Sequence, residues 1–307
     1  MEKLKVAIIG YGNVGCYAYD AVMEEPDMEL VGIVEVAKSK VWKKQFERIR
    51  QMKLSQTKVV EDISELGDFD VGLLCLPSRN VPEEAKNLLT AGYNVVDSFD
   101  IHSEILNLRN DLDVIAKNNN RVAITSAGWD PGIDSVIRAW FLAMTPRGIT
   151  TTNYGPGMSM GHTCAVKAID GVKDAIAITV PAGMGIHRRL VYVELDGGAD
   201  FNEVKQQILN DPYFINDRTY VYQVPNVQEL IDMGHGVSLE RKGVAGITHN
   251  QLLKFEMRIN NPAITAQVMV SSARAAMKQK PGCYTLIEIP VIDFLYGDLD
   301  YFIKRLV

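Results

Sequence analysis

The stretch VAIIGYGNVG, from Val6 to Gly15, decides the fold of this 307-residue chain. Its first four residues are apolar and favour extended structure, which predicts a buried parallel strand. The glycines that follow have the spacing G-x-G-x-x-G, which permits a tight turn at Gly10, a close approach of a pyrophosphate at Gly12 and close helix packing at Gly15. A helix that begins near Asn13 would direct its free N–H groups toward the phosphates.

A second predicted strand, residues 29–34, ends at an acid, Glu35, which lies twenty residues beyond Gly15. In dinucleotide-binding units an acid at this place accepts hydrogen bonds from the ribose hydroxyls. The alternative is a glycine turn that holds no ligand. The strand before the loop, the helix after it and the acid together favour a dinucleotide-binding domain.

The composition is that of an ordinary globular protein, with 47% hydrophobic and 23% charged residues. The net charge of −6 gives no reason to expect nucleic acid or an anionic membrane as a partner. No apolar run approaches the length of a membrane span, and no signal peptide is visible. The cysteines show no metal-ligand spacing. We therefore expect a cytoplasmic protein without a metal site.

One segment departs from the acidic balance. Between Lys38 and Lys58 there are eight Lys or Arg residues and one acid. Trp42, Phe46 and Ile49 recur at helical spacing, which predicts an amphipathic helix with a basic outer face. The simpler interpretation is a solvated face. The alternative is that Lys38 or Lys40 binds a 2′-phosphate on the adenosine ribose.

Strands and helices continue to alternate up to residue 126. Strands are predicted at 58–60, 70–76, 94–97 and 122–126, with helices at 82–90 and 103–118 between them. The strand at 70–76 ends at Pro77-Ser78, on the carboxyl edge of the sheet, where ligands bind in such folds.

The pattern changes at the turn-rich sequence Gly128-Trp129-Asp130-Pro131-Gly132, which we interpret as the exit from the first domain. Beyond it, strand-like runs at 176–180, 189–194 and 248–259 suggest an antiparallel sheet, and 263–278 reads as a helix. The sequence predicts a Rossmann-type doubly wound parallel sheet over residues 1–125, with 262–307 packing back on it. Residues 126–261 form a second α+β domain for substrate binding and dimerisation.

Two acids, Asp100 and Asp130, follow successive strands of the first domain. Both are expected to border the nicotinamide crevice, where a carboxylate suits a cationic substrate group such as an ammonium. The alternative is a helix-capping role, since Asp is common in turns before Pro.

Two arginines and two histidines are candidates in the second half. Arg188 and Arg189 open an apolar strand, and a guanidinium matches both oxygens of a substrate carboxylate. Strand alternation leaves one of the pair facing solvent. His162 and His235 stand among glycines, which allow close approach of a ligand, although a structural histidine is the simpler interpretation.

Several longer strings together resemble meso-diaminopimelate dehydrogenases over nearly the whole chain. These are residues 10–15, 126–132, 154–162, 248–251, 258–262 and 265–276. The form Met158-Ser159-Met160 and the short segment 183–189 resemble the group of these enzymes that also accepts simpler D-amino acids.

The resemblance implies a homodimeric enzyme of lysine biosynthesis. It would catalyse NADP-dependent, reversible oxidative deamination at the D-centre of meso-2,6-diaminopimelate. The implied substrate contacts are Asp100, Asp130, Met160, Gly161, Thr179, Arg189, His235 and Asn261. Of these, Asp130 and Asp100 are the expected catalytic residues. The resemblance selects Arg189 over Arg188 and leaves His162 as a neighbour of the site.

The chain departs from this family at one point. Relatives carry basic or hydroxyl-plus-basic residues after the second strand, whereas this chain has Glu35-Val36. A carboxylate there binds the ribose diol and repels a phosphate, which favours NAD. The cofactor is therefore expected to be NADP or NAD. The expected cofactor contacts are Gly10, Tyr11, Gly12, Asn13, Val14, Glu35, Lys38, Pro77 and Ser78.

Two alternative functions stay open at this point. One is a reductase of another lysine- or homoserine-pathway intermediate, although the chain lacks a His-His-x-x-Lys stretch and Cys164 reads as a packed thiol. The other is a non-catalytic NAD(P)-sensing regulator, which would have no use for paired Asp, Arg and His residues beside the nicotinamide.

Overall fold

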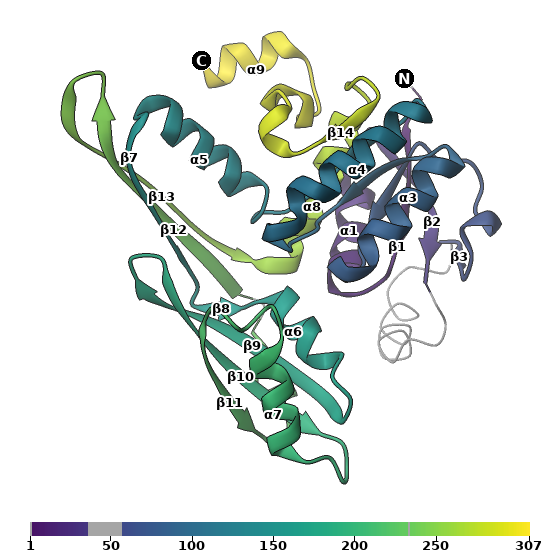
Figure 1. The fold of residues 1–307 in the computed structure, drawn as a ribbon. Coiled ribbons are helices and arrows are strands. Elements are labelled where there is room, and N and C mark those ends of the chain that lie inside the picture. The colour runs from purple at the N-terminus through teal and green to yellow at the C-terminus, as the bar shows by residue number, and fades with distance from the viewer. Residues whose placement is uncertain (1, 36–56, 233) are drawn as a thin grey trace. The chain divides into compact units, whose positions relative to one another are not determined.

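The computed structural model describes residues 2–35, 57–232 and 234–307 (Figure 1). Its contacts divide the chain into two units. Unit 1 comprises Met1–Val136 and Ala263–Val307, and unit 2 comprises Ile137–Pro262. The predicted division into residues 1–125 with 262–307 and residues 126–261 stays a prediction. Lys38 and the basic helix expected around it lie outside the described residues.

Unit 1 contains a seven-stranded parallel sheet with the order β14-β6-β5-β4-β1-β2-β3 (Figure 1). This confirms the predicted Rossmann-type sheet. The strands are β1 Leu4–Ile9, β2 Met28–Val34, β3 Val59–Val60, β4 Val71–Leu74, β5 Asn94–Asp97, β6 Val122–Ile124 and β14 Gly282–Tyr284. The helices are α1 Asn13–Glu24, α3 Val81–Ala91, α4 Ile105–Asn118 and α9 Leu299–Leu306, together with most of α8 Asn261–Ala276.

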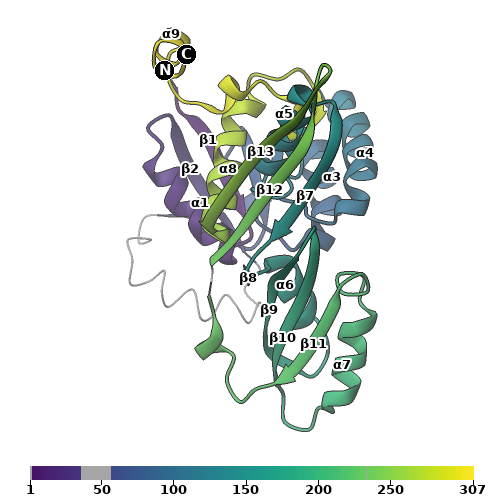
Figure 2. The same cartoon turned by 90° about the vertical axis from the view of Figure 1, so that its left-hand side faces the viewer.

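The sheet is covered on both faces because its strands are apolar on both sides. On β1, Val6 and Ile8 belong to one core cluster, with residues of α1 and α8. Ala7 and Ile9 belong to a second cluster, with residues of α3 and α4. The helices α1, α8, α3 and α4 are labelled in Figure 2. Each pair faces a different layer of helices, since side chains alternate along a strand. The carboxyl ends of β1, β4, β5 and β6 therefore share one edge.

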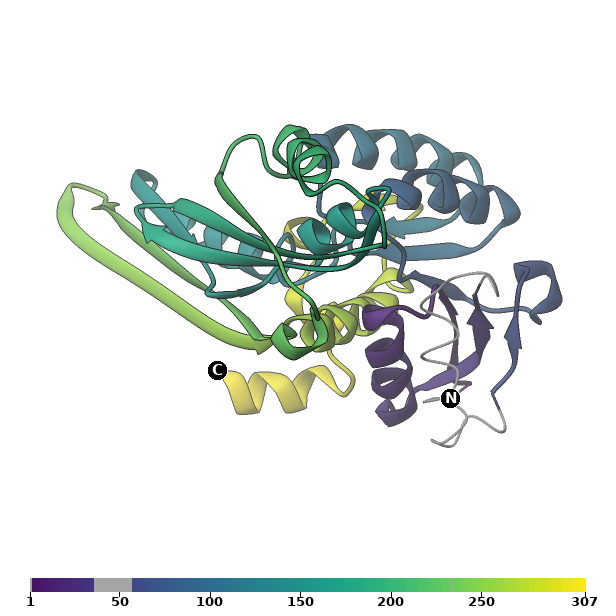
Figure 3. The same ribbon diagram turned by 90° about the horizontal axis from the view of Figure 1, so that it is seen from below.

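Unit 2 contains two sheets. The first has the order β11-β10-β9-β8 and the second the order β13-β12-β7, whose long β12–β13 hairpin is drawn in light green in Figure 3. The strands are β7 Arg147–Tyr154, β8 Gly157–Met158, β9 Val172–Gly183, β10 Ile186–Leu195, β11 Arg218–Gln223, β12 Gly234–Ala245 and β13 Thr248–Asn260. The helices α6 Met160–Lys167 and α7 Phe201–Asn210 belong to this unit, and α5 Ile133–Met144 runs into it.

The runs predicted at 176–180, 189–194 and 248–259 lie in β9, β10 and β13, and their antiparallel pairing is confirmed, although they belong to two sheets. A strand that was not predicted, β11, pairs in parallel with β10. A parallel neighbour needs a crossover rather than a hairpin, and α7 supplies it between β10 and β11. Helices α6 and α7 pack in one core cluster with these strands. In the described part of the chain, no helix has the length and apolar character that a membrane crossing needs.

Candidate functional site

The three glycines of the first loop have different roles in the structure. Gly10 has a φ of +92°, and a Cβ there would lie 2.7 Å from the Cys75 carbonyl oxygen. A Cβ on Gly15 would lie 2.1 Å from the Gly10 oxygen. Both residues are therefore glycine because the fold requires it. A Cβ on Gly12 would meet nothing within 4 Å. The open space at Gly12 fits the close approach of a pyrophosphate.

Replacing Gly12 by Ala is expected to weaken dinucleotide binding by roughly 10- to 100-fold, the scale of an extra methyl group in a packed contact. The melting temperature should stay within about 2 °C, because the φ of Gly12 is −76° and its Cβ would face open space. Titration of NADH fluorescence and thermal unfolding measure the two quantities. Gly15→Ala is the matched control and should lose stability as well. Unchanged dinucleotide affinity in Gly12→Ala would contradict this role.

Glu35 lies against the same loop. Its Oε2 accepts a hydrogen bond from the Tyr11 backbone N–H at 2.6 Å, and its own N–H is bonded to the Val60 carbonyl. The acid that follows β2 is thus fixed beside the glycine turn that follows β1. This is the arrangement in which a carboxylate can reach a ribose diol.

Asp100 and Ser78 come from neighbouring strand ends. The Ser78 hydroxyl donates to Asp100 Oδ1 at 2.6 Å, and the Asp100 backbone N–H donates to Ser78 Oγ at 3.2 Å. Pro77 directly precedes Ser78 in the sequence and lies in the segment that follows β4. The structure therefore joins a predicted cofactor contact to a predicted catalytic acid.

Asp130 occupies a closed turn. The Gly128 N–H donates to the Pro131 carbonyl at 3.1 Å, and a Cβ on Gly132 would lie 1.8 Å from the Gly128 oxygen. The Asp130 side chain is 9% exposed, and its Oδ2 lies 3.8 Å from Nε2 of the exposed His102. The tight backbone fixes the direction of this acid at the end of β6.

In unit 2, the two adjacent arginines separate as strand alternation predicts. Arg188 is exposed, whereas the Arg189 side chain is 12% exposed. The Arg189 guanidinium binds Asp217 Oδ2 through Nε at 2.7 Å and Nη2 at 2.6 Å, and its Nη1 donates to the Thr179 hydroxyl. Sequence reasoning missed Asp217, which lies in a loop with no local signal. Asp217 and Thr179 together hold the Arg189 guanidinium in one orientation.

The other predicted substrate residues of unit 2 lie in a row across its strands. Arg189 pairs with Thr179, and Thr179 pairs with Gly157. A Cβ on Gly157 would lie 2.1 Å from the Gly234 oxygen and 2.7 Å from the Cα of His235. The two sheets of unit 2 approach each other at this glycine. The row thus runs from Arg189 through Thr179 to His235.

Asn261 and the start of α6 belong to the same region. Asn261 is 4% exposed, and its Nδ2 donates to the Met158 carbonyl at 3.0 Å. Met158 belongs to β8, and Met160 and Gly161 open α6 two residues later. Ser159 is the residue before α6, which has eight residues. Asn261 therefore fixes the strand that leads into the predicted Met160 and Gly161 contacts.

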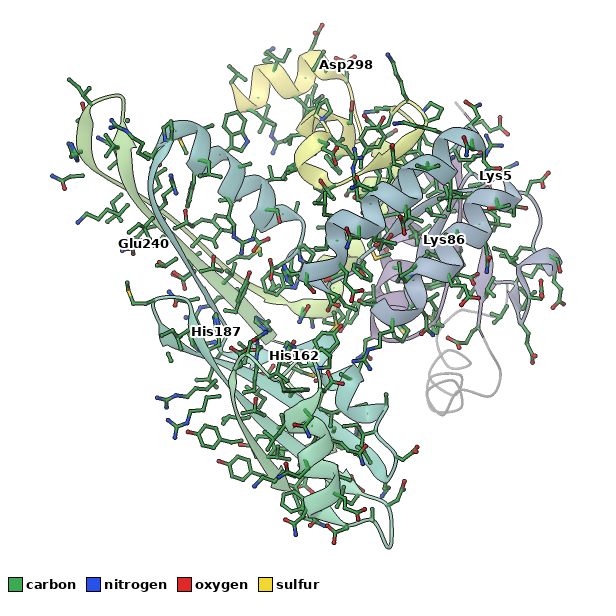
Figure 4. The ribbon with its side chains drawn as sticks, in the orientation of Figure 1. Lys5, Lys86, His162, His187, Glu240 and Asp298 are labelled. Carbon is green, nitrogen blue, oxygen red and sulfur yellow. The ribbon has the colours of Figure 1, made fainter. Side chains whose placement is uncertain are left out.

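The histidines of unit 2 have different surroundings (Figure 4). His162 Nδ1 lies 2.8 Å from Ser159 Oγ, and its ring packs edge-on against Tyr213 and Phe214. His235 is buried, and its Nδ1 accepts the Gly236 N–H at 2.7 Å. The contacts of His162 are those of a packed residue beside the row.

His187 was not predicted. It is 8% exposed, and its Nε2 accepts the Tyr154 N–H at 2.8 Å. Burial, followed by the positive charge of Arg189, lowers the pKa of His187, so that it stays neutral near pH 7. Alternation along the strand from Arg189 was the signal that could have found it.

The chain is similar to several known proteins. Residues 128–261 match a family described as "Diaminopimelic acid dehydrogenase C-terminal domain". The chain is 54% identical to a meso-diaminopimelate D-dehydrogenase of Bacteroides fragilis, with 100% of both chains covered. A solved structure of the DAP dehydrogenase of C. glutamicum in complex with DAP has a TM-score of 0.85 at 28% identity, covering 100% of both chains. An engineered D-amino acid dehydrogenase bound to NADP⁺ has a TM-score of 0.86 at 26% identity, covering 99% of this chain and 100% of that chain.

Proposed function

The chain belongs to the meso-diaminopimelate dehydrogenase family, and from this membership we propose that it deaminates the D-centre of meso-2,6-diaminopimelate oxidatively and reversibly, with NAD(P). It is an amino acid dehydrogenase that acts on a CH–NH₂ group. The products are ammonia and L-2-amino-6-oxopimelate, which cyclises to tetrahydrodipicolinate. The observation that carries the proposal is the 54% identity over the full length of both chains.

The residues of unit 1 fit a nicotinamide dinucleotide. Gly12 leaves space for the pyrophosphate, and Glu35 and Ser78 lie on the strand ends that surround a ribose and a nicotinamide in this fold. When bound, NAD(P) supplies the acceptor for the hydride of the substrate Cα. The protein's own contribution is to hold the dinucleotide along the carboxyl edge of the sheet.

The reaction requires a group that accepts a proton and a cationic group that binds the substrate carboxylate. The amine must be neutral before its Cα can lose a hydride, so we assign the ammonium proton to Asp130, with Asp100 orienting the amine. Arg189, fixed by Asp217 and Thr179, binds the carboxylate of the distal L-centre. His235 and Asn261 complete the contacts to that end. Water then hydrolyses the imine.

One assay tests the function and its scope. Ammonia release is measured with meso-diaminopimelate, D-alanine and D-lysine, each with NAD and NADP. We expect turnover of meso-diaminopimelate and slower turnover of the simpler D-amino acids. Tight dinucleotide binding without any amine-dependent reduction would contradict the proposal and support a sensing role. We propose a homodimer, because the apolar side chains of Trp140, Leu142 and Ile149 in unit 2 are 59%, 52% and 73% exposed. The cytoplasmic location is proposed from the sequence alone.

The cofactor preference depends on Glu35. We propose that the enzyme uses NAD at least as well as NADP, because a carboxylate fixed beside the glycine loop repels a 2′-phosphate. A lysine whose charge is screened by solvent contributes under about 1 kcal/mol. Glu35→Arg should shift the preference toward NADP.

Steady-state kinetics with both cofactors measure this preference. Glu35→Gln is the matched control, since an amide oxygen can still accept the Tyr11 N–H while the charge is lost. Its preference should lie between those of the wild type and Glu35→Arg. A wild-type kcat/KM for NADP more than about tenfold above that for NAD, a difference of 1.4 kcal/mol, would contradict the argument.

A further inference from the structure

Asp97, the last residue of β5, is fully buried and joins two strand ends. Its Oδ1 accepts three hydrogen bonds, from the Phe99 N–H at 2.9 Å, the Ser126 N–H at 3.0 Å and the Thr125 hydroxyl at 2.9 Å. Its carbonyl accepts the Ala127 N–H at 2.7 Å. One residue of β5 therefore fixes the backbone that leaves β5 and the backbone that leaves β6.

Each of these backbones leads to an acid of the proposed site. Asp100 directly follows Phe99, and Asp130 lies four residues beyond Ser126. We propose that Asp97 is a positioning residue that holds Asp100 and Asp130 in register for amine deprotonation. This inference rests on the proposed function, because it takes the roles of the two acids from it.

The surroundings of Asp97 differ from those of an aspartate that only stabilises a turn. Its Oδ2 and the hydroxyl of Ser126 are buried and have no hydrogen-bond partner among the described residues. Burial raises the pKa of Asp97 to about 6, so near pH 7 the ionised form persists in spite of desolvation. Ser126 has a φ of +58°, a region that disfavours side chains. Unsatisfied polar groups and backbone strain concentrate where geometry is constrained by function.

Two substitutions of Asp97 distinguish its role as a hydrogen-bond acceptor from its negative charge. An amide oxygen in Asp97→Asn can accept the same three hydrogen bonds, whereas Asp97→Ala can accept none. We expect Asp97→Ala to lower kcat for meso-diaminopimelate at least 10-fold and to change the dinucleotide Kd less than twofold. Asp97→Asn should stay within about threefold of the wild-type kcat. Equal losses in both variants, or a folded Asp97→Ala with normal kcat, would overturn the proposal.

Two further variants keep the test decisive if Asp97→Ala fails to fold. Thr125→Val removes one bond to Oδ1 at nearly constant volume, and it should lower kcat without changing dinucleotide affinity. No change in kcat would overturn the proposal.

Asp70→Ala is the matched control, because Asp70 Oδ2 accepts the Lys5 N–H at 2.8 Å at the opposite end of the sheet. Asp70→Ala should lower the melting temperature and leave kcat unchanged. If Asp70→Ala lowered kcat as much as Asp97→Ala does, the role of Asp97 would be structural only, and the proposal would be overturned.

A double-mutant cycle distinguishes this inference from the proposed function. If Asp97 acts through the acids, its replacement by Ala should cost less in an Asp130→Asn background than in the wild type. Full additivity would overturn the positioning role. Absence of turnover in the wild type, or a normal kcat in Asp130→Asn alone, would instead contradict the proposed function.

Discussion

Replacing Asp130 by Asn is expected to lower kcat by about 100-fold or more, the scale of losing a general base. The amide keeps the shape of the side chain but cannot take a proton from the ammonium. The glycine contacts and backbone hydrogen bonds of the turn around Asp130 stay in place when the carboxylate becomes an amide of the same shape. The dinucleotide affinity and the fold should therefore stay near those of the wild type.

Single-turnover hydride transfer with saturating substrate measures this effect. His102→Ala is the matched control, since His102 lies 3.8 Å from Asp130 and its side chain is 59% exposed. It should change kcat only a few-fold, as an exposed partner contributes little. A near-normal kcat in Asp130→Asn together with a lower melting temperature would show that the acid caps a helix or stabilises the turn instead.

The second large effect is expected for Arg189→Ala, which should raise KM for meso-diaminopimelate by roughly 10- to 150-fold. This corresponds to about 1.5–3 kcal/mol for a hydrogen bond to a charged group. The substitution also leaves Asp217 without its guanidinium partner, so part of the loss should appear as reduced stability. Stability and KM must therefore be measured separately, by thermal unfolding and initial rates.

The neighbouring residue supplies the control. Arg188→Ala removes the same charge from the exposed side of the same strand and should leave KM within about twofold. Arg189→Lys keeps the charge but loses the planar fork, so its KM should lie between those of the wild type and Arg189→Ala. If KM for meso-diaminopimelate is unchanged in Arg189→Ala, the clamp is assigned to the wrong residue.

The sequence predicts unit 1 well because its signals are local. The four apolar residues before Gly10 belong to β1, and the helix predicted at 82–90 is α3, which ends at Gly92 with a φ of +93°. The position of Glu35 beside the glycine loop was predicted from its spacing to the glycines. In the structure, its carboxylate accepts a hydrogen bond from the Tyr11 N–H. These features need only neighbouring residues and one strand pairing.

Features that depend on distant partners were not predictable in the same way. Asp217 meets Arg189 only because β10 and β11 run parallel after the α7 crossover. Asp97 reads as the end of a strand, and its role is visible only once β6 lies beside β5. One missed element had a usable signal, since Asp200 caps α7 and Glu203 follows three residues later. Among the substrate contacts of unit 2, Arg189 and His235 were candidates from their residue patterns, whereas Thr179 and Asn261 came from the family resemblance. All of them stay predictions.

The seventh strand of the parallel sheet has a consequence for synthesis of the chain. β14 completes the sheet beside β6, and α8 supplies part of the core over β1, yet residues 125–281 separate β6 from β14. On the ribosome, the sheet of unit 1 therefore waits on the order of ten seconds with an open edge. Open edges can pair with other chains. Unit 2 is continuous in sequence, whereas the sheet of unit 1, although synthesis of the chain begins with it, is complete only when β14 has been made.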